Sequence, residues 1–219
     1  MLVIGDRLEG WFERLRDDQN VREAFSRNPA VAGKTVLVSE PIPVYAISNR
    51  QIVRAGLVGA ARSGWSCLTF VSRESVAAVA ALDLRLSGKM LEFIRAFDGR
   101  PLDRMVAAIE KASELPEVKE SDFETRILEV PEIPWAAVWL TAVAGGTEDI
   151  FFPWAGIIDN LELLRAYQRD TVESVVGAFV GEQVKAEDSF WATKPLLAKA
   201  QDIGSAVAFS LKEGLRKLR

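Results

Sequence analysis

The stretch between Ile133 and Ile158 constrains the fold most, because it carries almost no charge. Glu148 and Asp149 are its only charged residues. A hairpin with one face in water should alternate polar and apolar residues, and this stretch hardly does so. We therefore expect a hairpin that meets apolar groups on both faces. Its aromatic residues are Trp135, Trp139, Phe151, Phe152 and Trp154.

The sequence leaves three partners open for the second face of this hairpin. The first is the helix predicted to follow it, the second is another protein subunit, and the third is a lipid-like ligand. Large exposed apolar patches are rare on monomeric proteins. An aromatic face that no helix covers would therefore indicate a protein contact or a ligand cavity.

Alternating and β-branched runs predict further strands, and apolar spacings of three to four residues predict helices. The predicted strands cover residues 35–38, 44–47, 65–71, 76–86, 90–97 and 123–130, and the hairpin joins 135–143 to 150–154. Pro101 is suited to the first turn of a helix, which Pro116 ends. Residues 51–61 fit a helix or a strand, because Gly56 and Gly59 weaken the helical pattern.

A first helix is predicted near the amino end, from Asp6 to Asn28, where Pro29 stops it. Its apolar residues form a narrow stripe that suits docking on a sheet. The stripe consists of Leu8, Trp11, Phe12, Leu15 and Phe25.

Helical spacing returns after the hairpin. One apolar stripe is predicted from Ile157 to Phe179, and a last amphipathic helix from Ala200 to Leu218. The basic end of this last helix suits the negative end of the helix dipole, although a membrane surface or a partner groove would also fit it. Its apolar edge includes Val207, Leu211, Leu215 and Leu218.

These elements predict an α+β fold with an N-terminal helix, a mostly antiparallel or mixed sheet with one intervening helix, and a C-terminal helical extension. The change from strands to helices near Gly156 divides the chain into an α+β domain, residues 1–155, and a helical extension packed on it, residues 156–219. A single domain is the alternative.

The chain contains no histidine and a single cysteine, Cys67. This composition excludes Ser-His-Asp and Cys-His catalytic pairs, histidine zinc sites and an intrachain disulfide. The carboxylates of Glu148, Asp149 and Asp159 could bind a hard cation, but they resemble ordinary turn residues. We therefore expect no metal and no cofactor.

The formal net charge is −4, from 27 basic and 31 acidic residues. So mild a charge does not favour nucleic-acid binding. No signal peptide is recognised at the amino end, and the longest uncharged stretch is too short for a membrane span. We expect a cytoplasmic protein without a transmembrane segment, for which peripheral membrane contact through the last helix is the less favoured option.

These observations favour a non-catalytic structural or adaptor subunit that acts in a homo- or hetero-oligomeric assembly through apolar protein–protein contacts. The five hairpin aromatics would form one contact surface, and the apolar edge of the last helix another. Two alternatives stay open: a protein that binds a small, lipid-like apolar ligand, and an enzyme that uses carboxylates without histidine.

Overall fold

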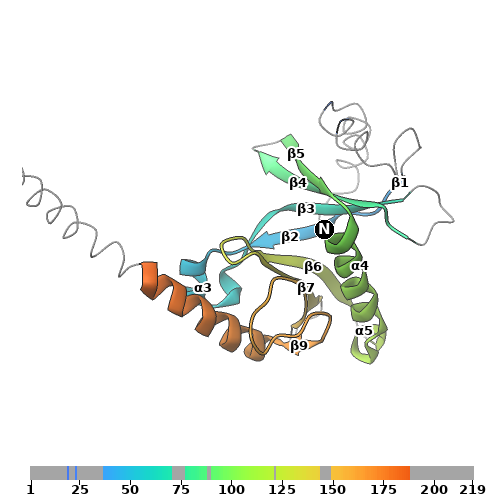
Figure 1. The fold of residues 1–219 in the computed structure, drawn as a ribbon. Helices are drawn as coiled ribbons and strands as arrows, with labels where there is room; N and C mark the ends of the chain where they lie inside the picture. Colours follow the sequence, from blue (N-terminus) through green and yellow to red (C-terminus); the bar gives the residue numbers. More distant parts are fainter. Residues whose placement is uncertain are drawn as a thin grey trace, which may run out of the picture.

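The computed structural model describes residues 37–70, 77–87, 90–120, 122–143 and 149–187, together with the isolated positions Gln19 and Glu23. In these ranges nine strands form one mixed sheet in the order β5-β4-β3-β2-β6-β7-β8-β9, with β1 also beside β3 (Figure 1). All neighbouring strands are antiparallel except β2 and β6, which are parallel. The α+β class and the mixed sheet are confirmed.

The first half of the sheet contains five strands: β1 (Leu37–Val38), β2 (Ile42–Ala46), β3 (Ala61–Phe70), β4 (Ala80–Ser87) and β5 (Met90–Phe97). A helix, α3 (Asn49–Ala55), and a 3-10 turn, η1 (Leu57–Gly59), connect β2 to β3. Ser48 caps α3, because its side chain accepts a hydrogen bond from the backbone N–H of Gln51, as in a capping box. The ambiguous residues 51–61 are therefore mostly helical.

The second half of the sheet begins after α4 (Gly99–Glu114) and α5 (Pro116–Glu120). These helices carry the chain back so that β6 (Phe123–Val130) runs beside β2. The predicted hairpin is confirmed as β7 (Trp135–Ala142) and β8 (Ile150–Ala155), and the short β9 (Tyr167–Gln168) follows. The expectation of one intervening helix is wrong, because both α3 and α4 lie between strands.

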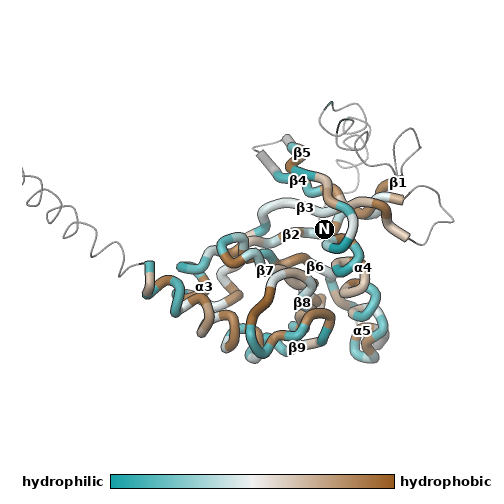
Figure 2. Tube along the Cα trace, in the orientation of Figure 1, coloured by the Kyte–Doolittle hydropathy of each residue, from teal (hydrophilic) through white to brown (hydrophobic). Residues whose placement is uncertain are grey.

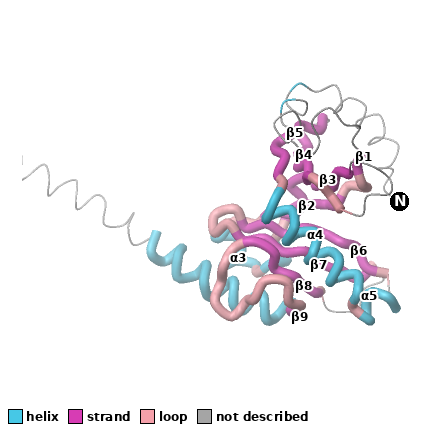
Figure 3. The backbone as a smooth tube through the Cα atoms, turned by 45° about the vertical axis from the view of Figure 1, so that its right-hand side comes forward, coloured by secondary structure: helices cyan, strands magenta, loops and turns pink. Residues whose placement is uncertain are grey.

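Helices cover both faces of the second half of the sheet. Figure 3 shows α4 lying across the strands, and we call this side the α4 face. Helix 169–187 lies with α3 on the opposite face (Figure 1). Along both long helices hydrophobic and hydrophilic residues alternate (Figure 2). The cluster on the α4 face includes Leu102, Met105, Ala108, Val138, Phe152 and Trp154. The cluster on the opposite face includes Ile52, Leu128, Trp135, Phe151, Val172 and Val176.

The sheet curls toward the α4 face. Arg95 of β5 lies 3.0 Å from Glu129 of β6, although β4, β3 and β2 separate these strands. In a flat sheet, four strand spacings would hold them about 19 Å apart, which is more than the two side chains can span. The curl brings backbones close together at Gly64 of β3, where a Cβ atom would lie 1.9 Å from the carbonyl oxygen of Leu84.

The helix predicted from Ile157 to Phe179 is wrong in its first half. Helical structure begins only at residue 169. Before it, Asn160 and Leu164 adopt positive φ angles of 69° and 63°, and the Leu164 N–H donates to the carbonyl of Pro153 at 2.7 Å. Turns thus fold this apolar segment back on the sheet. Its apolar residues are nevertheless spaced in the sequence as they would be in a helix.

The predicted N-terminal helix, residues 6–28, and the last amphipathic helix, residues 200–218, lie outside the described ranges apart from Gln19 and Glu23. Within the described ranges, the residues that follow the predicted boundary near Gly156 form no hydrophobic core of their own. Ile158, Leu161 and Val180 share one hydrophobic cluster with the strands.

We predict that Gly64→Ala lowers the free energy of unfolding by about 1–3 kcal/mol, because the added methyl group overpacks against the Leu84 backbone. Gly177→Ala is the matched control: it lies in helix 169–187 with no atom within 4 Å of its added Cβ. Helix propensity should make it stabilising by roughly 0.5–1 kcal/mol. Urea denaturation of both variants tests this, and equal effects would contradict it.

Candidate functional site

The hairpin aromatics lie mainly inside the fold. Trp135 and Phe151 belong to the cluster under helix 169–187, and Phe152 and Trp154 belong to the cluster under α4. All four are at most 5% exposed, and Trp139 is partly buried. The chain's own helices therefore cover both faces, as the first of the three alternatives expects. In this conformation the four rings expose little surface, and their role as a contact surface for another subunit stays a prediction.

The second predicted contact surface cannot be placed. Val207, Leu211, Leu215 and Leu218 lie outside the described ranges. Their role in binding a partner stays a prediction.

Trp139 is the centre of a row of stacked side chains on the face opposite α4. Its ring stacks on Phe151 at 5.8 Å and meets the edge of Tyr45 at 5.3 Å. The Arg126 guanidinium lies 4.8 Å from the Trp139 ring and 4.9 Å from that of Tyr45, and its Nε donates to Glu124 at 3.0 Å. This cation–π arrangement stabilises the contact between β2, β6 and β7.

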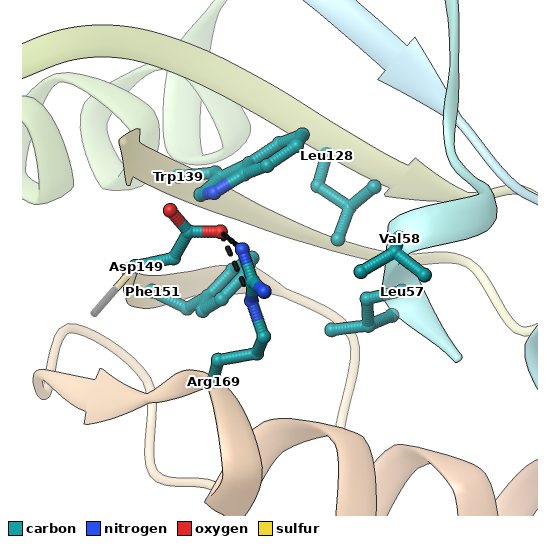
Figure 4. Close-up of a pocket in the computed structure, with 7 residues that line it drawn as sticks. All are labelled: Leu57, Val58, Leu128, Trp139, Asp149, Phe151 and Arg169. Atoms are coloured by element: carbon teal, nitrogen blue, oxygen red, sulfur yellow. Dashed lines mark hydrogen bonds and ion pairs between the residues drawn. The ribbon is translucent and has the colours of Figure 1, made fainter. Parts of the chain in front are cut away.

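A small pocket opens beside this row (Figure 4). Asp149, which is 4% exposed, accepts a hydrogen bond from Nε of Arg169 at 3.1 Å, and this hydrogen bond raises the pKa of Arg169. The indole nitrogen of Trp139 is buried with no hydrogen-bond partner. Leu57 and Val58 lie on the other side of the pocket (Figure 4).

The volume of this pocket is about 10 Å³, which is room for about one water molecule. Sites for drug-sized ligands measure roughly 300–1,000 Å³. The pocket beside Trp139 is therefore too small for a lipid chain. In its wall, the buried Asp149 pairs with Arg169, whose side chain is 38% exposed.

A second charged group lies on the α4 face. Arg95 bridges Asp83 at 2.6 Å and Glu129 at 3.0 Å. Burial raises the pKa of Glu129 and the charge of Asp83 raises it further, while Arg95 opposes both effects. The hydroxyl of Ser66, which is cross-strand from Asp83, is buried without a partner. Arg95 thus joins the carboxylates of Asp83 and Glu129 from two different strands in one ionic bridge.

Cys67 of β3 is fully buried. Burial raises the pKa of its thiol to about 12, with a smaller contribution from Asp83. Because the thiolate is the reactive form of cysteine, this residue is inert at neutral pH while the chain is folded.

Two of the three candidate cation ligands, Asp149 and Asp159, lie within the described ranges. Asp149 is paired with Arg169, Asp159 is exposed, and Glu148 lies outside the described ranges. In the part of the chain that the structure describes, no three cysteine or acidic side chains could jointly hold a metal ion. None of the described helices has the length and apolar character needed to cross a membrane.

Comparison with known proteins gives no relative: no family model matches the chain, and neither the curated proteins nor the solved structures contain a match.

Sequence reasoning missed all three charged contacts: Arg126 with Glu124, Arg169 with Asp149, and Arg95 with Asp83 and Glu129. The spacing of Glu124 and Arg126 on one strand was a usable signal, because residues two apart share a face of a strand. The bridge among Asp83, Arg95 and Glu129 had no local signal, since it depends on the curl of the sheet.

We predict that Arg169→Leu lowers the free energy of unfolding by about 1–3 kcal/mol, because it leaves the Asp149 carboxylate buried and unpaired. Arg165→Leu is the control: its partner is Glu162, and the two side chains are 64% and 75% exposed. Its effect should stay below about 1 kcal/mol. Chemical denaturation measures both, and equal losses would show that burial of Asp149 is unimportant.

A third prediction concerns pH. The pKa of Glu129 in the folded chain lies above the ordinary value of 4.5, so the folded state holds this proton more tightly than the unfolded chain does. The contribution of Glu129 to stability therefore falls as pH rises through the raised pKa. Glu129→Gln removes this titration. The stability of the variant relative to the unmodified chain should therefore increase as the pH rises from below 4.5 to neutrality.

Denaturation curves across this pH range test the prediction. Glu162→Gln serves as the control, because the side chain of Glu162 is 75% exposed. A difference in stability between the Glu129→Gln variant and the unmodified chain that stays constant with pH would contradict the expected effect.

Proposed function

We propose that this protein is a non-catalytic structural or adaptor subunit of an oligomeric assembly, and that it pairs with a second copy of itself along β5. The observation that carries the proposal is the free edge of the sheet. β5 spans eight residues, Met90–Phe97, and among the described strands only β4 pairs with it. An edge strand presents unpaired backbone N–H and C=O groups, which are a template for another strand.

The side chains of β5 suit an apolar contact. The register between β4 and β5 shifts at Asp83 and Leu84, which pair with Arg95 and Phe93. Ile94 is left without a cross-strand partner on β4, and it is 44% exposed. A bulge of this kind re-aims a side chain at a sheet edge, so Ile94 is free to meet a neighbouring molecule.

The charges of β5 complement each other in a symmetric pair. An antiparallel arrangement of two β5 strands that places Phe93 opposite Ile94 also places Glu92 opposite Arg95, once on each side of the twofold axis. Glu92 is exposed, and the side chain of Arg95 is 54% exposed. Arg95 keeps its bonds to Asp83 and Glu129, and Glu92 of a second copy would add a third carboxylate near the same guanidinium. Opposite charges across a strand pair are stabilising, which favours a second copy of this chain as the partner.

We predict that the full chain sediments at micromolar concentration as a species of twice its 24.1 kDa mass. Ile94→Lys should weaken this association at least about tenfold, a free-energy change of about 1.4 kcal/mol, because two lysines then approach each other across the twofold axis. Sedimentation velocity over a concentration series measures the change.

Ile157→Lys is the matched control, because Ile157 is 87% exposed and lies outside β5. It should leave the association constant unchanged. A strictly monomeric chain, or equal weakening by the two substitutions, would overturn the proposed pairing.

A further inference from the structure

One apolar face of the sheet is buried although no described helix covers it. On β3 and β4, Trp65 pairs with Leu84 and Cys67 pairs with Leu82. Because antiparallel cross-strand neighbours point to the same side, these four side chains form one face, which we call the β3–β4 face. Their exposed fractions are only 7%, 2%, 0% and 2%, respectively. A strand pair cannot bury its own face, so another layer must lie over it.

The described helices cover other parts of the sheet. None of the four side chains belongs to the cluster under α4 or to the cluster under helix 169–187. Ala81, which alternates with Leu82 along β4, belongs to the α4 cluster. Helix α4 therefore lies on the reverse side of β4, and the β3–β4 face needs a layer from elsewhere.

We propose that the N-terminal segment, residues 1–36, docks on the β3–β4 face through its apolar stripe. The segment joins the sheet at the right place, because Leu37 of β1 pairs with Phe70 of β3 and Val38 pairs with Thr69. The stripe supplies Leu8, Trp11, Phe12 and Leu15, which match an apolar face in chemistry.

The other parts of the chain outside the described ranges fit this face less well. Residues 71–76 only join β3 to β4, and so short a connection cannot cover both strands. Residues 188–219 continue from helix 169–187, which lies beside α3 on the second half of the sheet (Figure 1). The inference depends on burial and connectivity, and none of the observations behind it comes from the proposed pairing along β5.

Cys67 provides a built-in probe of this docking, because it is the only cysteine of the chain and lies in the covered face. We predict that Trp11→Asp in the full chain raises the rate of Cys67 modification by a thiol reagent at least about tenfold, since a charge in the stripe weakens the layer. Arg14→Asp is the control, because it introduces the same side chain outside the stripe. Circular dichroism verifies that both variants are folded.

An equal modification rate in the two variants would overturn the proposal. A second measurement covers the case in which Trp11→Asp does not fold: a photo-crosslinking amino acid replaces Leu15 in the otherwise unchanged chain. Mass spectrometry should then find crosslinks to β3 or β4 within one chain. Crosslinks confined to other regions, or formed only between two copies, would contradict docking within the chain.

Discussion

The lack of charge on either face of the β7–β8 hairpin is the constraint on which the rest of the fold depends. Apolar side chains alternate between two clusters along β7, so Trp135 faces helix 169–187 while Val138 faces α4. Neither face can be left in water without a large cost in hydrophobic free energy. Both α4 and helix 169–187 are therefore required to cover the hairpin. The position of α4 in the chain, before β6, is linked to the order of the strands.

The curl of the sheet determines which polar groups meet. Gly64 permits the close backbone approach to Leu84, and the curl carries Arg95 over the α4 face to Glu129. Arg95 thus ties β5, the edge among the described strands, to the centre of the sheet. An edge strand held in this way keeps a defined orientation, which is a condition for pairing with a single register.

The sequence predicts the hairpin, most strands and α4 because their apolar periodicity is local. It fails between Ile157 and Tyr167, where an apolar spacing typical of a helix belongs to turns that need positive φ angles at Asn160 and Leu164. The stack on Trp139 and the bridge at Arg95 join strands distant in the sequence. Strand order and sheet curl, which no local pattern specifies, create both.

The proposed layer over the β3–β4 face and the proposed pairing along β5 involve different groups but affect each other. Pairing uses the backbone edge of β5, whereas the layer covers side chains such as Leu82 and Leu84 on the neighbouring strand. Without the layer these residues would lie exposed beside a free edge, and an exposed apolar edge strand aggregates. In this proposal, covering the face confines association to the edge, where Glu92 and Arg95 of the two copies favour one antiparallel register.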